Sequence, residues 1–287
     1  VVAGSLAQSM AAINEFSPHM VLGVGGYASG PAVLAAFLKG VPAAIAEQNA
    51  IPGETNKVLA RLAKKVFLSF PDNGWVPPGK AVVTGNPIRA GLLERKAAAE
   101  KDGRFTILVF GGSQGAHRIN QAMIEALGFL GESLNSIRII HQTGGEDLED
   151  VRRAYERESR EGLVAEALPF ISDMNQAYGR ADLLVCRAGA TSIAEITACG
   201  KAAVLIPFPF AVADHQTRNA EALESAGAAV LLPQKELDGK KLAGVIIDLF
   251  GHPEKIRAME QASSRLGHPD AARRVVDECI GIIKGQA

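Results

Sequence analysis

Two glycine-rich turns in this sequence are of the type that holds phosphate groups. Residues 21–38, VLGVGGYASGPAVLAAFL, run from an apolar strand pattern through a glycine pair into a Ser-Gly-Pro helix start, and residues 107–123, ILVFGGSQGAHRINQAM, repeat this layout. Glycine lets backbone N–H groups approach a ligand closely, and the positive end of the following helix favours an anion. Neither turn has the dinucleotide or P-loop spacing. Both turns together favour a nucleoside diphosphate ligand over plain tight β–α turns.

The stretch CRAGATSIAEITACG, residues 186–200, offers a carboxylate at the start of a helix. Ser192 and Glu195 match the spacing of a capping box, in which Glu195 only satisfies an N–H of its own helix. In the alternative interpretation, Glu195 lies at the carboxyl edge of the sheet and accepts hydrogen bonds from a ribose diol. The residues alone leave both interpretations open.

Further polar side chains lie near the same predicted edge. Asp214 is the expected N-cap of a helix within residues 207–223, which would place Gln216 and Asn219 on one face. Solvated amides are the simpler explanation for these two residues. Arg89 follows Asn-Pro-Ile at a predicted domain junction, where it is either a linker residue or a clamp for a diphosphate.

The sequence offers no metal-binding pattern. It contains no Asp-x-Asp, and no His, Asp and Glu residues have metal-ligand spacing. His117, His141 and His215 each follow or end a predicted strand, and turn or capping roles are favoured over a role as base. We therefore expect no cofactor and no metal, with a diphosphate neutralised by helix dipoles, backbone N–H groups and arginine.

The elements that position these residues alternate between short apolar runs and amphipathic stretches, which is typical of α/β proteins with parallel sheets covered by helices. A charged stretch at 86–104 separates two sets of strands. The second set forms a complete doubly wound sheet, whereas the first has about half the strands of such a domain. We therefore expect an N-terminal portion with at least one strand–turn–helix unit to be missing before Val1. The predicted strands are 20–24, 42–46, 65–69, 81–85, 105–110, 137–141, 163–167, 182–186, 202–206 and 228–232.

Composition excludes several classes of protein. The 287 residues carry a formal net charge of −1, which gives no basic footprint for nucleic acid. Three scattered cysteines form neither a disulfide framework nor a zinc motif and fit a reduced cytosolic setting. The most apolar run, residues 202–213, is too short to span a bilayer.

Eight ordered motifs make the whole chain resemble the MurG family of bacterial N-acetylglucosaminyltransferases. In chain order they are VLGVGGYASGPAVLAA, AEQNAIPGETNKVLAR, VTGNPIR, FGGSQGAHRIN, HQTG, PFISDM, ADLLVCRAGATSIAEITACGKAAVLIPFP and DHQTRNAEAL.

The resemblance implies a GT-B glycosyltransferase with two Rossmann-like domains, the N-terminal one incomplete. Residues 1–88 would belong to the acceptor-side domain, 89–270 to the UDP-GlcNAc-binding domain, and 271–287 to a helix that crosses back to the first domain. The implied reaction transfers GlcNAc with inversion to the C4 hydroxyl of lipid-linked N-acetylmuramoyl-pentapeptide, in peptidoglycan synthesis. The implied partners are UDP-GlcNAc, the lipid-linked acceptor and the inner face of the cytoplasmic membrane, where the enzyme would be peripheral, and no nucleic acid.

The resemblance also implies site residues. Glu195 would take the ribose and Ile171 the uracil edge, while Gly25, Gly26 and Tyr27 would face the acceptor diphosphate. The catalytic base of the family would lie upstream of Val1 and stays unknown here. The residues implied to contact UDP-GlcNAc are Asn49, Arg89, Ser113, Ile171, Ala190, Thr191, Ser192, Ile193, Ala194, Glu195 and Gln216.

Other functions stay open at this stage. The chain could be a donor-binding fragment without transfer activity. It could also be another GT-B enzyme, such as a diacylglycerol glycosyltransferase or a UDP-GlcNAc 2-epimerase, although EQNAIPGETN beside GGYASGP argues against both. An oxidoreductase is least favoured, because neither glycine turn has dinucleotide spacing.

Overall fold

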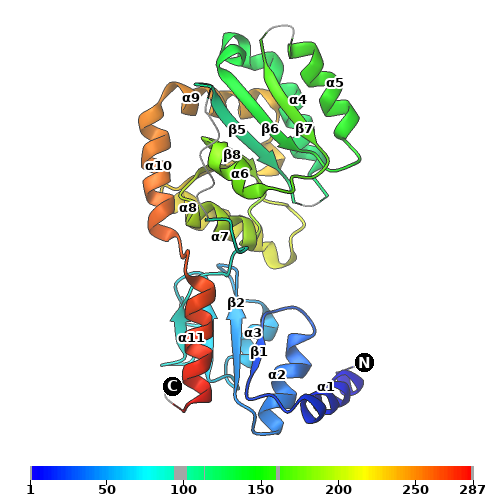
Figure 1. The fold of residues 1–287 in the computed structure, drawn as a ribbon, viewed down its shortest axis with the longest axis vertical. Helices are drawn as coiled ribbons and strands as arrows, with labels where there is room; N and C mark the ends of the chain where they lie inside the picture. The colour runs from blue at the N-terminus through cyan, green and yellow to red at the C-terminus, as the bar shows by residue number, and fades with distance from the viewer. Residues whose placement is uncertain (1, 94–101, 113, 160–161, 286–287) are drawn as a thin grey trace. The chain divides into compact units, whose positions relative to one another are not determined.

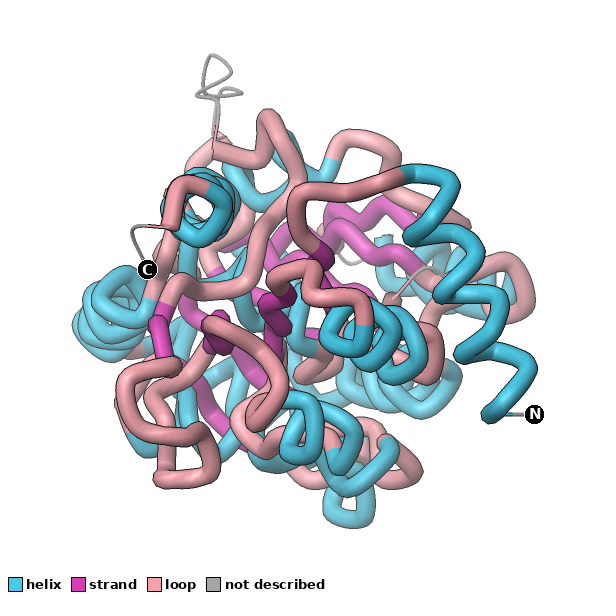
Figure 2. The backbone as a smooth tube through the Cα atoms, turned by 90° about the horizontal axis from the view of Figure 1, so that it is seen from below, coloured by secondary structure: helices cyan, strands magenta, loops and turns pink. Residues whose placement is uncertain are grey.

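The computed structural model describes residues 2–93, 102–112, 114–159 and 162–285. The chain divides into two compact units. Unit 1 combines residues 1–88 with 268–287, and unit 2 comprises residues 89–267. Each unit is a parallel sheet with helices packed on its faces, so strands lie inside and helices outside (Figures 1 and 2).

Unit 2 contains a six-stranded, all-parallel sheet in the order β10-β9-β8-β5-β6-β7. Counted from β5, this is the 3-2-1-4-5-6 order of doubly wound folds, and the order reverses between β5 and β8. The six strands are β5 (Phe105–Phe110), β6 (Ile137–Gln142), β7 (Val164–Leu168), β8 (Leu183–Cys186), β9 (Ala202–Leu205) and β10 (Ala229–Leu231).

Among the described residues of unit 2, seven α-helices pack around this sheet. Apolar residues of α4, α5, α9 and α10 form one buried cluster with side chains of β5 and β6, among them Ile107, Val109 and Ile139. From α6, the ring of Tyr178 packs edge-on against Phe110 of β5, with ring centroids 6.1 Å apart. The helices are α4 (His117–Leu130), α5 (Leu148–Ser159), α6 (Met174–Arg180), α7 (Ala190–Ala198), α8 (His215–Ser225), α9 (Gly239–Gly251) and α10 (Pro253–Leu266).

Unit 1 is built on a four-stranded parallel sheet in sequential order, β1 (Val21–Gly23), β2 (Ala43–Glu47), β3 (Lys65–Leu68) and β4 (Ala81–Val83). Helices α1 (Val2–Phe16), α2 (Ser29–Leu38) and α3 (Glu54–Leu59) share a buried cluster with β2 and β3. A second cluster joins Ala44 and Phe67 of the sheet to Val275 and Ile282 of α11 (Ala271–Ile283). The last helix of the chain therefore packs on the sheet formed by the first strands (Figure 1).

The prediction of an α/β protein with parallel sheets is confirmed, and each of the ten predicted strands is present within one or two residues. The helix start at Ser29-Gly30-Pro31 is also confirmed. Among the described residues, none of the helices is both long enough and apolar enough to cross a membrane.

Candidate functional site

The strand order of unit 2 locates the candidate site. Ligands of doubly wound sheets bind beyond the carboxyl ends of the strands, where the strand order reverses. Here the reversal lies between β5 and β8, so α4 and α7 begin on either side of it. Their N-cap residues are Ala116 and Gly189, whose side chains cannot cap a helix. The first backbone N–H groups of both helices are therefore available to donate to a ligand.

The turn between β5 and α4 requires its glycines. Gly112 and Gly115 have φ values of 105° and 78°, which side chains rarely allow. A Cβ atom on Gly115 would lie 1.9 Å from the carbonyl oxygen of Thr143, and one on Gly144 would lie 2.1 Å from that of Gln114. The glycine turn and the turn after β6 thus pack backbone against backbone. Ser113, a predicted donor contact, lies outside the described residues.

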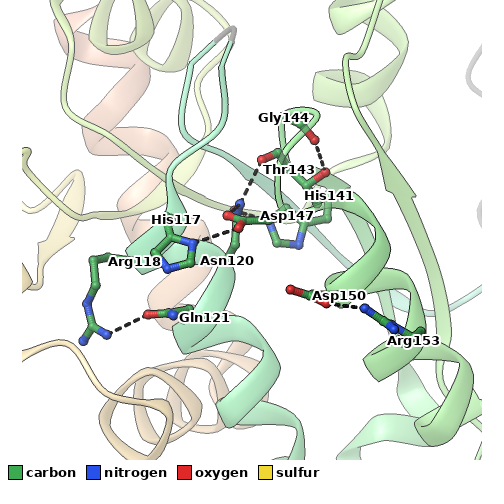
Figure 3. A network of polar contacts seen from close by, with 10 residues as sticks. All are labelled: His117, Arg118, Asn120, Gln121, His141, Thr143, Gly144, Asp147, Asp150 and Arg153. Carbon is green, nitrogen blue, oxygen red and sulfur yellow. Dashed lines mark hydrogen bonds and ion pairs between the residues drawn. The ribbon is translucent and has the colours of Figure 1, made fainter.

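A polar network fixes the start of α4 against the turn after β6 (Figure 3). The amide nitrogen of Asn120 donates to the Thr143 carbonyl at 2.8 Å and to Asp147 Oδ2 at 2.7 Å. Asp147 Oδ1 lies 2.8 Å from His117 Nδ1. His141 lies 3.0 Å from Asn120 Oδ1 through Nε2 and 2.7 Å from the Tyr155 hydroxyl through Nδ1. Three elements are joined behind the glycine turn.

The position of His141 corrects the prediction that it is a turn or capping residue. It lies within β6 and is completely buried. Burial lowers the pKa of its imidazole from 6.5 to about 3, so the ring is neutral in the folded protein. Its two hydrogen-bond partners, Tyr155 and Asn120, satisfy the neutral ring, but neither carries a charge that would offset the cost of burying a charged imidazole.

We expect His141 to make stability depend on pH. Because its pKa is lower in the folded than in the unfolded chain, the unfolded chain binds the proton first as the pH falls. Stability is therefore full above pH 6.5 and is lost as the pH falls towards 3. Between pH 7 and pH 5 the loss from this residue is about 2 kcal/mol. Urea unfolding of the wild type and of His141→Gln at both values measures it. An equal decrease in both proteins would contradict this assignment.

Glu195 is not part of a capping box. Helix α7 begins at Ala190 with Gly189 as N-cap, so Glu195 lies in its second turn. Its carboxylate is buried, with a side-chain exposure of 3%, and Oε1 accepts a hydrogen bond from Arg89 Nε at 3.0 Å. The hydroxyl of Tyr178 donates to Oε2 at 3.3 Å, and burial raises the pKa of Tyr178 well above its usual value. Glu195 is held by tertiary contacts rather than by its own helix terminus.

The other predicted contacts on α7 differ in what they can offer. Thr191 is exposed and Ser192 is half-buried, so both hydroxyls border the surface. The Ile193 side chain is buried, and its N–H already donates to the Gly189 carbonyl at 2.9 Å. The backbone N–H groups available to an anion are therefore those of the first turn, at Ala190, Thr191 and Ser192. Ala194 is half-buried beyond them.

The segment that leads into α8 confirms the prediction of Asp214 as N-cap and corrects that of a solvated Asn219. Asp214 is the N-cap residue, but it has a left-handed conformation with φ 56° and makes no capping hydrogen bond through its side chain. Gln216 Oε1 accepts from the Phe208 N–H at 3.0 Å, and the Asn219 amide, fully buried, donates to the Ala188 carbonyl at 3.2 Å. Asn219 is therefore a packed amide that ties α8 to the loop after β8, not a solvated one.

A surface pocket lies beside Arg89. Residues 89–92 and 172–175 line a volume of about 200 Å³, and the lining residue Asn175 donates to the Gly91 carbonyl at 2.7 Å. Ile171, the predicted uracil contact, is buried directly before this lining segment. Arg89 and the residues after Ile171 are thus neighbours in the fold of unit 2.

In unit 1, Asn49 belongs to a loop organised by a buried carboxylate. Glu47 ends β2 and is 4% exposed. Its Oε1 accepts from the backbone N–H and the amide of Asn49, at 3.0 and 3.2 Å. Its Oε2 accepts from the Gly53 N–H at 3.0 Å and from the Asn56 amide at 2.8 Å. One carboxylate thus shapes the loop that carries Asn49.

The predicted acceptor turn of unit 1 has the backbone that its glycines allow. Gly25 and Gly26 have φ values of 90° and 74°. Ser29 Oγ donates to the Gly25 carbonyl at 2.6 Å, and the Gln48 amide donates to the Val24 carbonyl at 3.0 Å. Tyr27 is 97% exposed. The turn is ordered by its flanking side chains and presents Tyr27 to solvent.

Among the described residues, no group of three or more His, Cys, Asp and Glu side chains is placed to hold a metal ion. His117 and His215 are the first residues of α4 and α8, and the N-cap residues of these helices are Ala116 and Asp214, so neither histidine has the predicted capping role. Several residues that shape the site carried no prediction from sequence. They are Glu47, Asn120, Gln142, Tyr178 and Arg187, whose guanidinium donates to the carbonyls of Ile206 and Pro207 at 3.1 Å each. A polar residue at a strand end, as Glu47 and Gln142 are, is the signal that could have found two of them.

The fold and the candidate site together define a glycosyltransferase of the GT-B type. The model of the glycosyltransferase family 28 C-terminal domain matches residues 106–275. The model of the N-terminal domain of the same family matches residues 2–68.

Relatives specify the family further. A protein of Syntrophus aciditrophicus is 56% identical over 283 residues, which cover 98% of this chain and 78% of the relative. A protein of Myxococcus xanthus is 49% identical, covering 96% of this chain and 72% of the relative. Both are named UDP-N-acetylglucosamine–N-acetylmuramyl-(pentapeptide) pyrophosphoryl-undecaprenol N-acetylglucosamine transferase. The crystal structure of Acinetobacter baumannii MurG has a TM-score of 0.82 at 36% identity, covering 96% of this chain and 78% of that one. The chain belongs to this transferase family, MurG, and the resemblance seen in the sequence is confirmed.

Proposed function

We propose that this protein transfers N-acetylglucosamine from UDP-GlcNAc to the C4 hydroxyl of lipid-linked N-acetylmuramyl-pentapeptide, with inversion. Family membership supports the reaction, because relatives that align with nearly the whole chain carry the name of this activity. The observation that carries the donor half is the buried carboxylate of Glu195 beside the strand-order reversal of unit 2.

Glu195 is suited to a ribose diol. An ionised carboxylate has about four lone-pair sites, and Arg89 and Tyr178 use two of them. Two hydroxyl donors of a ribose can take the others. Arg89, whose side chain is 57% exposed, covers the carboxylate and is the group that moves aside as the nucleotide enters. Its guanidinium then becomes available to the uridine diphosphate.

The leaving diphosphate would be stabilised by the protein backbone. The first turns of α4 and α7 direct N–H groups and the positive ends of both helices toward the same edge of the sheet. We assign the diphosphate contacts to the glycine turn with Ser113 and to residues 190–192, and the remaining donor contacts to Asn49, Ile171 and Gln216. In unit 1, we assign Gly25, Gly26 and Tyr27 to the acceptor diphosphate.

UDP-GlcNAc is expected to bind without a divalent metal, since backbone dipoles and arginine neutralise the diphosphate. Calorimetric titration with UDP-GlcNAc, UDP-glucose and NADH, each with and without EDTA, tests this expectation. UDP-GlcNAc should bind with unchanged affinity in EDTA, and NADH should not bind. Loss of binding on chelation would contradict the metal-free site. Failure of UDP-GlcNAc to bind under any condition would contradict the proposed function.

We also propose that the protein works as a peripheral protein at the cytoplasmic face of the membrane, where its lipid-linked acceptor is anchored. Exposed apolar side chains at the end of α2, Phe37 and Leu38, precede Lys39 and support contact with an anionic surface. Flotation with anionic vesicles should carry the wild type upward and Phe37→Ser/Leu38→Ser less so. Equal flotation of both proteins would exclude this contact.

A further inference from the structure

The HQTG motif, residues 141–144, covers the end of β6 and the start of the following turn. It has no role in the donor contacts assigned above, yet one of its side chains joins two of the loops that carry them. Gln142 is the last residue of β6 and is 5% exposed. Its amide nitrogen donates to the Gly112 carbonyl at 2.7 Å. Its amide oxygen accepts from the Ile171 N–H at 2.9 Å. Both ends of one buried side chain are therefore bonded to backbone groups of other loops.

The sheet explains why a single residue can reach both loops. Strand β6 lies between β5 and β7 in the sheet, and all three strands run in parallel. Gly112 follows β5 and Ile171 follows β7, so both loops emerge beside the carboxyl end of β6. A glutamine at that end spans the space between its two neighbours. Its donor and acceptor match the carbonyl and the N–H that the loops present.

These two loops take different parts of one ligand in the proposed function, on which this inference rests. The glycine turn would hold the diphosphate, and Ile171 would contact the uracil edge. The distance from base to diphosphate is a fixed property of a nucleoside diphosphate. Tight binding therefore favours a site in which the two loops already have the matching separation, because ordering mobile loops on binding would cost conformational entropy and weaken the affinity.

We propose that Gln142 is a positioning residue for nucleotide recognition, which sets the separation of the glycine turn from the Ile171 segment. The side chain acts through the two backbone groups that it bonds and does not itself contact the nucleotide. The Ile171 N–H is donated to Gln142, which leaves the Ile171 carbonyl to accept a hydrogen bond from a base. An acceptor selects the N3–H of uracil over the unprotonated N3 of cytosine.

Gln142→Met tests the proposal, because methionine has a similar length and shape but forms neither hydrogen bond. Leaving the Ile171 N–H and the Gly112 carbonyl without their partner is expected to weaken UDP binding roughly tenfold or more. The preference for UDP over CDP is expected to decrease as well. Calorimetric titration of the full chain with UDP and CDP gives both quantities, and a thermal melt checks that the variant is folded.

Two further variants separate positioning from stability. Gln142→Glu keeps an acceptor for Ile171 but places a charge against the Gly112 carbonyl, so UDP binding should weaken while the preference for uracil is partly kept. Gln176→Met removes an exposed amide of α6 and should change neither quantity. If Gln142→Met melts at a lower temperature but keeps the wild-type ratio of UDP to CDP affinity, the residue is only structural and the proposal is wrong. If the wild type binds neither UDP nor UDP-GlcNAc, the proposed function itself fails.

Discussion

Glu195→Gln is expected to weaken UDP binding about 10- to 150-fold while leaving the protein folded. The charged carboxylate would accept hydrogen bonds from the ribose, and a hydrogen bond to a charged group contributes roughly 1.5–3 kcal/mol. Glutamine preserves the shape of the side chain, but its amide nitrogen cannot accept. Calorimetric titration with UDP and with 2′-deoxy-UDP measures the effect. The wild type should prefer UDP clearly, and the variant should bind both nucleotides alike.

A matched control for Glu195 is Glu221→Gln in α8, which removes the charge of an exposed partner of Arg218. This variant should bind both nucleotides as the wild type does. If Glu195→Gln kept the preference for UDP and only melted earlier, the carboxylate would serve to hold Arg89 and Tyr178 rather than to bind ribose.

Glu47→Gln is expected to destabilise unit 1 by about 2–4 kcal/mol. The Glu47 carboxylate accepts from four donors of the loop after β2. Glutamine is isosteric, but its NH2 group would replace one of the two carboxylate oxygens, and the two donors that bond that oxygen would lose their acceptor. Unfolding in urea measures the loss, and hydrogen exchange at Asn49 and Gly53 should report faster opening of the loop.

Glu54→Gln is the control for this variant, because Glu54 lies in the same part of the chain and forms only an exposed ion pair with Lys57. Exposed pairs of this type contribute little, so its stability should change by less than about 1 kcal/mol. A similar loss in both variants would mean that Glu47 does not organise the loop.

The strands could be predicted from sequence because each is a short apolar run, and a strand buried on both faces needs little else. The position of Glu195 on its helix could not. If the helix began directly after Ser192, the Ser-x-x-Glu spacing would form a capping box; because it begins at Ala190, Glu195 lies in the second turn. Helix boundaries predicted from sequence are uncertain by a few residues, so the two cases could not be told apart. Its partner Arg89 is 106 residues away, so no local pattern indicates the pair.

The errors at His141 and Asn219 share one physical cause. Each is a polar residue beside an apolar run, where local composition suggests a solvated end of an element. Burial is decided by other segments instead, because Tyr155 and Asn120 enclose the ring of His141, and the Ala188 carbonyl receives the amide of Asn219. The glycine turns were easier to predict, because only a residue without a Cβ atom readily adopts a positive φ or allows a close backbone approach.

The packing of α11 on the first sheet has a consequence for how the chain is made. Unit 2 is continuous, whereas unit 1 combines residues 1–88 with residues 268–287. As the polypeptide leaves the ribosome, Ala44 and Phe67 emerge long before Val275 and Ile282, which bury them. One face of the first sheet therefore stays uncovered throughout synthesis of unit 2, a period in which exposed apolar surface invites aggregation or chaperone binding. Apolar residues of the sheet that are synthesised early are thus covered by a helix that is synthesised late.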